Sequence, residues 1–205
     1  MEMFKRGVYL CVSVALVACG GQEPQSQQEP GAELATQEAG LTAGTSRGCS
    51  FNIFSIQRPG TLPPVYDVRL NRAASATCPW AQASLLLGSS TSFSPVLSLA
   101  ANDLGVAVSY VYKSSPSGSA PSLLSLLHVD PETMTFVRSE GLSAGMFGSG
   151  RIYTGSLAIL ADGTTLTASG TKTGVISGET GSGGNYVATY ADFFTSTTPR
   201  TVVAY

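Results

Sequence analysis

His128 is the one histidine of this 205-residue chain, and it stands two residues before a carboxylate. In the run Leu126-Leu127-His128-Val129-Asp130, a β-strand places His128 and Asp130 on the same face. A histidine oriented by a carboxylate is the beginning of a general base that activates a nucleophile. The sequence assigns no nucleophile to this pair, so a strand residue near a turn is the simpler interpretation. We therefore name no catalytic residue.

Other patterns resemble sites but lack the context that those sites need. Gly44-Thr45-Ser46-Arg47-Gly48 matches the Gly-x-Ser-x-Gly string of a nucleophile elbow, which requires a strand before it and a helix after it. The glycine-rich run 178–184 lacks the Lys-Ser/Thr pair of a phosphate loop. A glycosidase needs a pair of carboxylates, and Asp67, Asp103 and Asp192 are available to supply it. Each lies near a predicted strand end or turn, where Asp is common. We expect no metal and no cofactor, because one histidine and no calcium-loop pattern leave too few ligands.

Tyrosines supply the one positive indication of ligand binding. Tyr110 and Tyr112 alternate on one face of a predicted strand, and Tyr186 and Tyr190 share a face of another. Rings on an exposed sheet face form platforms for glycans or peptides, because the ring is apolar and its hydroxyl is polar. The same spacing also serves cross-strand packing pairs. These four tyrosines are the candidate binding residues.

Alternating apolar residues and turn signals predict β-strands through most of the chain. The predicted strands are 50–57, 65–70, 97–101, 106–113, 123–129, 134–137, 157–161, 164–169, 186–192 and 201–204. Asp162-Gly163 predicts a hairpin turn between two of them. Pro79–Leu87 is the one predicted helix, although Leu85-Leu86-Leu87 is equally typical of a buried strand.

Residues 98–137 and 156–203 repeat one order of strands and turns. Each stretch predicts a four-stranded antiparallel meander, which resembles a blade of a β-propeller. A closed propeller has about four to eight blades, whereas this chain has material for two, or nearly three if residues 49–97 are included. The predicted fold is all-β, with two blade-like meanders packed as a sandwich or as a partial propeller.

The run Leu16-Val17-Ala18-Cys19 closes an apolar stretch that follows Lys5 and Arg6. A charged start, a short apolar core and small residues at a cleavage point make up an export signal. The apolar run is too short to span a bilayer. This run resembles the lipobox of bacterial lipoproteins. The resemblance implies that the signal peptide, residues 1–18, is removed and that Cys19 carries acyl chains such as palmitate. Gly20, in place of Asp, implies an outer-membrane lipoprotein on the periplasmic face or the cell surface.

Residues 19–47 are predicted to be a disordered tether that begins at the lipidated cysteine. They are rich in Gln and Glu and contain no aromatic residue, so they cannot bury enough apolar surface to fold. Residues 48–205 form the predicted extracytoplasmic β domain. Its eight acidic and eight basic residues show no basic cluster, which argues against a nucleic-acid partner.

Four cysteines occur in the chain, and the lipobox accounts for two of them. Cys11 leaves with the signal and Cys19 is acylated, so Cys49 and Cys78 remain. An oxidising compartment favours a disulfide between them. The chain has no Cys-x-x-Cys redox motif, which makes a structural disulfide the preferred prediction.

These observations predict a membrane-anchored surface or periplasmic lipoprotein whose domain is a non-catalytic binding or envelope-structural module. One alternative is a hydrolase that acts on envelope or external polymers through His128 or a carboxylate pair. Another is an inhibitor or immunity protein held at the membrane. The predicted partners are the membrane, through the lipid anchor, and a glycan or protein ligand.

Overall fold

The computed structural model describes residues 41–145 and 150–205. In these ranges the regular secondary structure consists of β-strands alone. The signal, Cys19 and most of the predicted tether lie outside the described residues. Within the described ranges, no helix has the length and apolarity needed to cross a membrane. The all-β prediction is confirmed.

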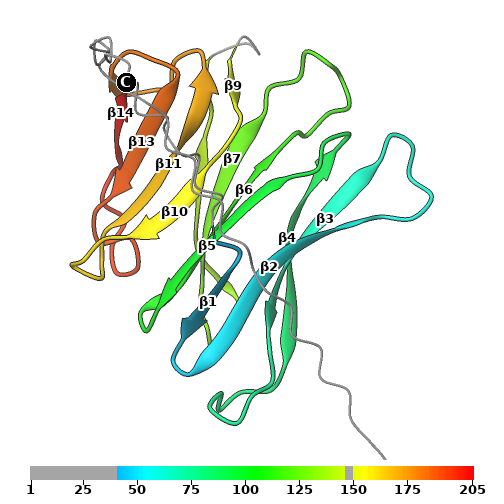
Figure 1. Ribbon diagram of the computed structural model, residues 1–205, viewed down its shortest axis with the longest axis vertical. Helices are drawn as coiled ribbons and strands as arrows, with labels where there is room; N and C mark the ends of the chain where they lie inside the picture. The colour runs from blue at the N-terminus through cyan, green and yellow to red at the C-terminus, as the bar shows by residue number, and fades with distance from the viewer. Residues whose placement is uncertain (1–40, 146–149) are drawn as a thin grey trace, which may run out of the picture. The chain divides into compact units, whose positions relative to one another are not determined.

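Three antiparallel meanders follow one another along the chain (Figure 1). The first sheet contains β1 (Ala43–Ser46), β2 (Cys49–Gln57), β3 (Val65–Arg72) and β4 (Ala83–Thr91), in that order. The second sheet contains β5 (Val96–Asn102), β6 (Gly105–Tyr112), β7 (Leu123–Val129) and β8 (Phe136–Leu142), also in order. The third sheet has β10 (Ser156–Ile159), β11 (Leu166–Thr173), β13 (Asn185–Tyr190) and β14 (Thr201–Ala204), with β12 (Glu179–Gly181) beside β14 and β9 (Arg151–Ile152) beside β11. The stretches 98–137 and 156–203 thus fold as the second and third sheets.

The sheets pack face to face in chain order, with a separate apolar core in each interface. Phe51, Ile53 and Leu70 of the first sheet meet Val108 and Leu127 of the second. A second core joins the second and third sheets and is filled by the residues Leu124, Leu126, Leu142, Leu166, Tyr186 and Tyr190. The innermost strands β1, β5 and β10 lie side by side (Figure 1). The packing is sandwich-like at each interface, and the described sheets do not close into a barrel. Residues 43–91 form a full sheet of their own, so the described chain has three sheets where the sequence predicted two meanders.

The middle position of the second sheet explains the unusual sequence of β6. Gly105 to Val111 are all buried, because the first sheet covers one face and the third sheet covers the other. A strand that is covered on both faces carries apolar residues at successive positions instead of alternating them with polar ones. The run Val106-Ala107-Val108 fits this environment.

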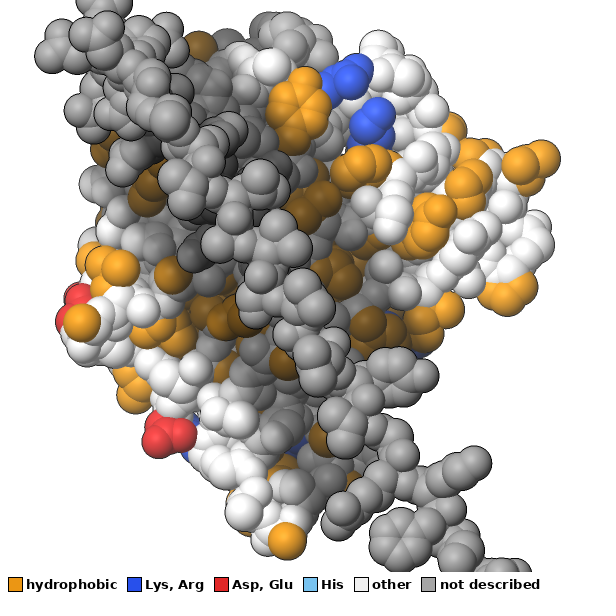
Figure 2. Space-filling view, in the orientation of Figure 1, with side chains coloured by type: hydrophobic (Ala, Val, Ile, Leu, Met, Phe, Trp, Pro, Cys, Tyr) orange, Lys and Arg blue, Asp and Glu red, His pale blue; other side chains and the backbone are white. Residues whose placement is uncertain are grey.

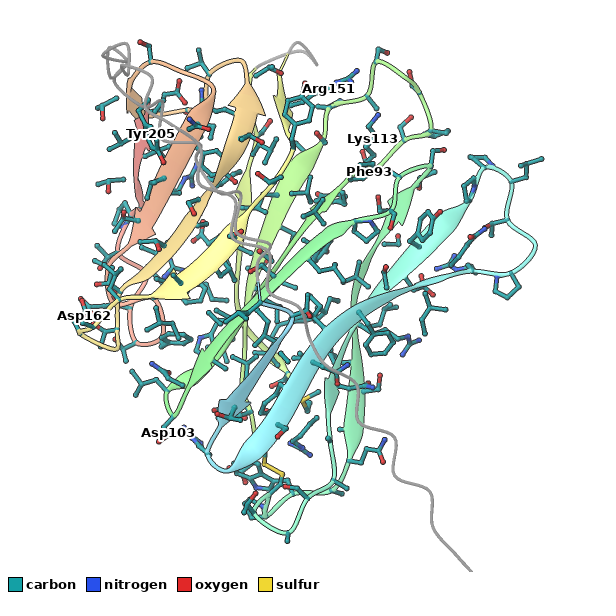
Figure 3. All side chains as sticks on the ribbon, viewed as in Figure 1. Phe93, Asp103, Lys113, Arg151, Asp162 and Tyr205 are labelled. Carbon is teal, nitrogen blue, oxygen red and sulfur yellow. A yellow bond between two sulfur atoms is a disulfide. The ribbon has the colours of Figure 1, made fainter. Side chains whose placement is uncertain are left out.

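Hydrogen bonds between hairpin turns link the three sheets at one end. Arg47, in the β1–β2 turn, donates its backbone N–H to the Asp103 carboxylate at 2.8 Å and its Nε to the Asp103 carbonyl at 2.9 Å. Asn102 in turn donates its side-chain amide to the carbonyl of Gly163 at 2.7 Å. Figure 3 labels Asp103 and Asp162 at these turns of the second and third sheets. The turns therefore fix the spacing of the innermost strands.

Two arginines, the buried Arg72 and the partly buried Arg138, join each sheet to the next one. Arg72 of β3 donates to the carbonyls of Pro131 and Glu132, both at 2.6 Å, in the β7–β8 connection. Arg138 of β8 donates to the carbonyl of Ser196 at 2.8 Å, in the β13–β14 connection. In both cases a guanidinium of one sheet holds the connection between the third and fourth strands of the following sheet, so it sets how the sheets are stacked.

The corresponding connection of the first sheet is held by a disulfide. Cys49 and Cys78 are bonded, which confirms the predicted pairing. Cys49 begins β2, and Cys78 lies between β3 and β4. In the described ranges no sheet precedes the first one to supply an arginine, so the disulfide secures this connection instead.

Two sequence predictions about the first sheet are wrong. The predicted helix Pro79–Leu87 is absent, and β4 begins at Ala83, because Leu85 and Leu87 pack into the core as residues of a strand. The range assigned to the tether ends earlier than predicted, since residues 43–46 form β1. This strand is almost devoid of large apolar residues, but its backbone pairs with β2.

Candidate functional site

His128 and Asp130 do not form an exposed base. The His128 ring is buried and packs against Phe194 in a T-shaped contact with 5.1 Å between centroids. Burial lowers the pKa of His128, outweighing the opposing effect of the Asp130 charge. The Asp130 carboxylate is used within its own turn, where it accepts hydrogen bonds from Glu132 and Thr133, and these lower its pKa. His128 therefore packs in the core and Asp130 stabilises its turn, so both residues have a structural role.

The three aspartates that could supply the carboxylate pair of a glycosidase occupy separate sheets. Asp67 on β3 pairs with Arg58 at 2.6 Å, and Asp103 belongs to the turn linked to Arg47. Asp192 follows β13 and holds a positive φ of 50° in a turn. Among the described residues, no group of three or more His, Cys, Asp or Glu is placed to hold a metal ion.

The Gly-x-Ser-x-Gly string forms a hairpin and lacks the architecture of a nucleophile elbow. Ser46 ends β1 and is buried, and Arg47 and Gly48 make the turn into β2 with φ values of 48° and 79°. Successive positive φ angles are typical of the tight turns that join antiparallel strands. The following element is a strand, so the helix that an elbow requires is missing.

Three of the four candidate tyrosines lie in the cores. Tyr186 and Tyr190 are 0% exposed, and the Tyr186 hydroxyl donates to the carbonyl of Thr154 at 2.8 Å. Tyr110 is 6% exposed and donates to the carbonyl of Leu87 at 3.2 Å. These rings pack between sheets and do not form the surface platform expected from their spacing. Burial raises the pKa of Tyr110 and of Tyr186, and it raises that of Tyr190 to about 12.

Tyr112 is the candidate tyrosine that stays partly exposed, and it lines a groove. The groove has a volume of about 420 Å³ and lies on the second sheet. The groove is lined by Tyr112, Leu123, Leu124, Ser125, Ser139, Glu140, Gly141, Leu142 and Ser143. Strand register places six of them on the face that packs against the first sheet at Val108 and Leu127, namely Tyr112, Leu123, Ser125, Ser139, Gly141 and Ser143. The first sheet leaves the outer part of this face open, which makes the groove.

The groove combines an aromatic wall with small polar residues. The Tyr112 ring is held by the Tyr110 ring, with 5.4 Å between centroids. Gly141 pairs with Ser125 across β7 and β8 and offers no side chain. A Cβ added at Gly141 would meet only the carbonyl oxygen of Leu124 at 3.8 Å, an ordinary contact. A ligand side chain can occupy the space that Gly141 leaves.

A charged cluster lies on the opposite face of β8. Arg138 donates through Nε and Nη2 to Glu140 at 3.1 and 3.0 Å, and Arg200 approaches Glu140 at 3.8 Å. Two buried donors of the cluster, the Tyr190 hydroxyl and the Arg200 Nε, have no hydrogen-bond partner in the described structure. Two guanidinium groups face one carboxylate, so the cluster carries a net positive charge.

Sequence reasoning identified Tyr112 but missed Ser125, Ser139 and Gly141. Each is a small residue flanked by larger ones in its strand, and this difference in size is the feature of the sequence that could have indicated a recess. Their joint role depends on strand register, which the pattern alone does not specify. The arginines that hold the sheets were also missed, because a single Arg in a strand looks like a solvated residue. On the face drawn in Figure 2, most of the visible coloured surface is hydrophobic or uncharged.

Known proteins do not indicate a ligand for this groove. No protein-family model matches the chain, and neither a curated protein nor a solved structure matches it.

Proposed function

We propose that the chain is a lipid-anchored, extracytoplasmic binding protein that holds its ligand in the groove on the second sheet. The anchor is Cys19, as the lipobox resemblance implies, and the domain is a non-catalytic module. The outer membrane is the site of attachment, and residues 19–42 serve as the spacer. The expected ligand class is a glycan or a protein segment.

The groove is the single observation that carries the binding role. An open recess of about 420 Å³ falls within the usual range of ligand sites, roughly 300–1,000 Å³. A partly exposed Tyr112 and the hydroxyls of Ser125 and Ser139 supply apolar contact and hydrogen bonds together. Such mixed surfaces suit ligands that are themselves partly polar.

Two further observations support an exported, non-catalytic protein. The Cys49–Cys78 disulfide is the kind of cross-link that persists in oxidising compartments. The residues that a hydrolase would use are not placed as a catalytic pair. His128 is buried against phenylalanine rings, and Asp130 accepts hydrogen bonds within its own turn. A hydrolase is therefore the less favoured function.

Photo-crosslinking in intact cells tests the binding role. A benzophenone amino acid at Ser139, which is exposed and lines the groove, is expected to give a discrete crosslinked product on illumination. The matched control is the same amino acid at Ser84, an exposed serine of β4 that does not line the groove. Crosslinking at Ser139 but not at Ser84, detected by a mass shift on gels, is the predicted result. Equal labelling from both positions, or none from Ser139, would contradict a ligand in the groove.

A further inference from the structure

The outer edges of the three sheets differ in how they are covered. In the third sheet, β12 adds to β14 in parallel, with Glu179 opposite Val202 and Gly181 opposite Ala204. The outer strands of the first and second sheets, β4 and β8, each pair on one side only in the described structure. An unpaired strand edge presents backbone donors and acceptors that can bind another extended segment. The third sheet shows that an outer edge of this fold accepts an additional strand.

The edge of β8 has a defined length and a recess beside it. A register shift at Val137 interrupts pairing at one end, and the bridge between Ala144 and Ile176 closes the other. The window between them, residues 138–143, spans roughly 20 Å of extended chain. Ser139, Gly141 and Ser143 of this window line the groove, whereas no residue of β4 lines it. Strand addition at β8 therefore engages both the backbone edge and the groove.

The two faces of β8 impose different chemistry on an added strand. On the groove face, the missing side chain at Gly141 leaves room for an aliphatic residue. On the opposite face lies the cluster of Arg138, Glu140 and Arg200, with its net positive charge. The Glu140 and Arg200 side chains are 28% and 27% exposed, so an approaching strand can reach them. Because neighbouring residues of a strand point to opposite faces, an aliphatic residue must alternate with an acidic one.

We propose that an extended peptide segment adds to the second sheet along β8, with an aliphatic side chain beside Gly141 and an acidic side chain beside Arg200. This inference rests on the proposed binding function and specifies the ligand as a protein segment that alternates aliphatic and acidic residues. Backbone hydrogen bonds to the edge supply affinity, and the two faces supply specificity.

A synthetic peptide provides the probe. The full-length chain is titrated with a fluorescent, end-blocked heptapeptide of alternating valine and glutamate, and binding is followed by anisotropy. Gly141→Trp fills the groove and is expected to weaken binding at least tenfold. Ser84→Trp is the matched control on the exposed side of β4 and is expected to leave binding unchanged. Circular dichroism verifies that both variants are folded.

Changes in the peptide test the same proposal with the protein unaltered, so the result does not depend on whether a protein variant folds. Replacing glutamate by lysine is expected to weaken binding at least fivefold, and Arg200→Leu is expected to remove this discrimination. Methylation of alternate backbone nitrogens is expected to abolish binding, because it removes the donors that pair with the edge. Failure of the valine–glutamate peptide to bind, or equal binding to the Gly141→Trp chain, would overturn strand addition. Crosslinking at Ser139 to a non-peptide ligand in that case would leave the binding function intact and refute only this occupant.

Discussion

Arg72→Leu is expected to lower the free energy of unfolding by about 3 kcal/mol, although Arg72 lies far from the groove. Its guanidinium donates to Ala81 within the first sheet at 2.7 and 3.0 Å, and to Pro131 and Glu132 of the second sheet. It also lies 5.5 Å from the centre of the Trp80 ring. Leucine keeps part of the apolar packing but leaves three carbonyl oxygens without this donor. A fully buried acceptor that loses its partner costs about 1–3 kcal/mol. The bond to Pro131 is buried and the bonds to Ala81 and Glu132 are partly buried, and relief from burying a charge offsets part of the cost.

Urea denaturation followed by circular dichroism measures the effect of Arg72→Leu. Arg58→Ala provides the control, because it removes an arginine of the same sheet whose ion pair with Asp67 is exposed. We expect this control to change stability by less than about 1 kcal/mol. If the two variants lost similar amounts, the interface between the first two sheets would not depend on Arg72.

Loss of the disulfide is expected to have an effect of similar size. The double substitution Cys49→Ala and Cys78→Ala opens a loop whose ends are 29 residues apart in sequence. The chain-entropy model assigns such a cross-link roughly 3–4 kcal/mol. Cys49 is also fully buried in the core between the first and second sheets, so its replacement adds a small packing loss.

Reduction of the unaltered chain provides the comparison for the double variant. Dithiothreitol should lower the urea midpoint of the unaltered chain and should have no effect on the variant that lacks both cysteines. Because the disulfide holds the β3–β4 connection, we expect the loss to appear as cooperative destabilisation. An unaltered midpoint on reduction would show that this connection is secured by other contacts.

The strands themselves were largely predictable from the sequence. Residues 123–129 were predicted as a strand and form β7 with the same bounds, because turn-forming residues flank an apolar run on both sides. The β4 segment was mistaken for a helix because three successive leucines, Leu85 to Leu87, carry no period that separates a helix from a buried strand. The short strand β1 was missed because Ala43, Gly44 and Thr45 resemble a linker in composition.

The groove was less predictable, because it depends on how whole sheets are stacked. Alternation correctly placed Tyr110 and Tyr112 on one face of β6, but the first sheet covers Tyr110 and leaves Tyr112 partly open. Tyr186 and Tyr190 became core residues because the second sheet covers their face. A pattern along one strand identifies which side chains share a face, whereas the neighbouring sheet decides which of them reach solvent.

Lipid anchoring is tested most directly by the chemical state of Cys19 in the chain extracted from the producing cells. Mass spectrometry of the amino-terminal peptide is predicted to find a chain that begins at Cys19 and carries a diacylglyceryl group on its sulfur. The same chain is predicted to fractionate with the outer membrane and to become unanchored in Cys19→Ala. A mature chain with an unmodified Cys19, soluble in the periplasm and unaffected by Cys19→Ala, would contradict display on a lipid anchor.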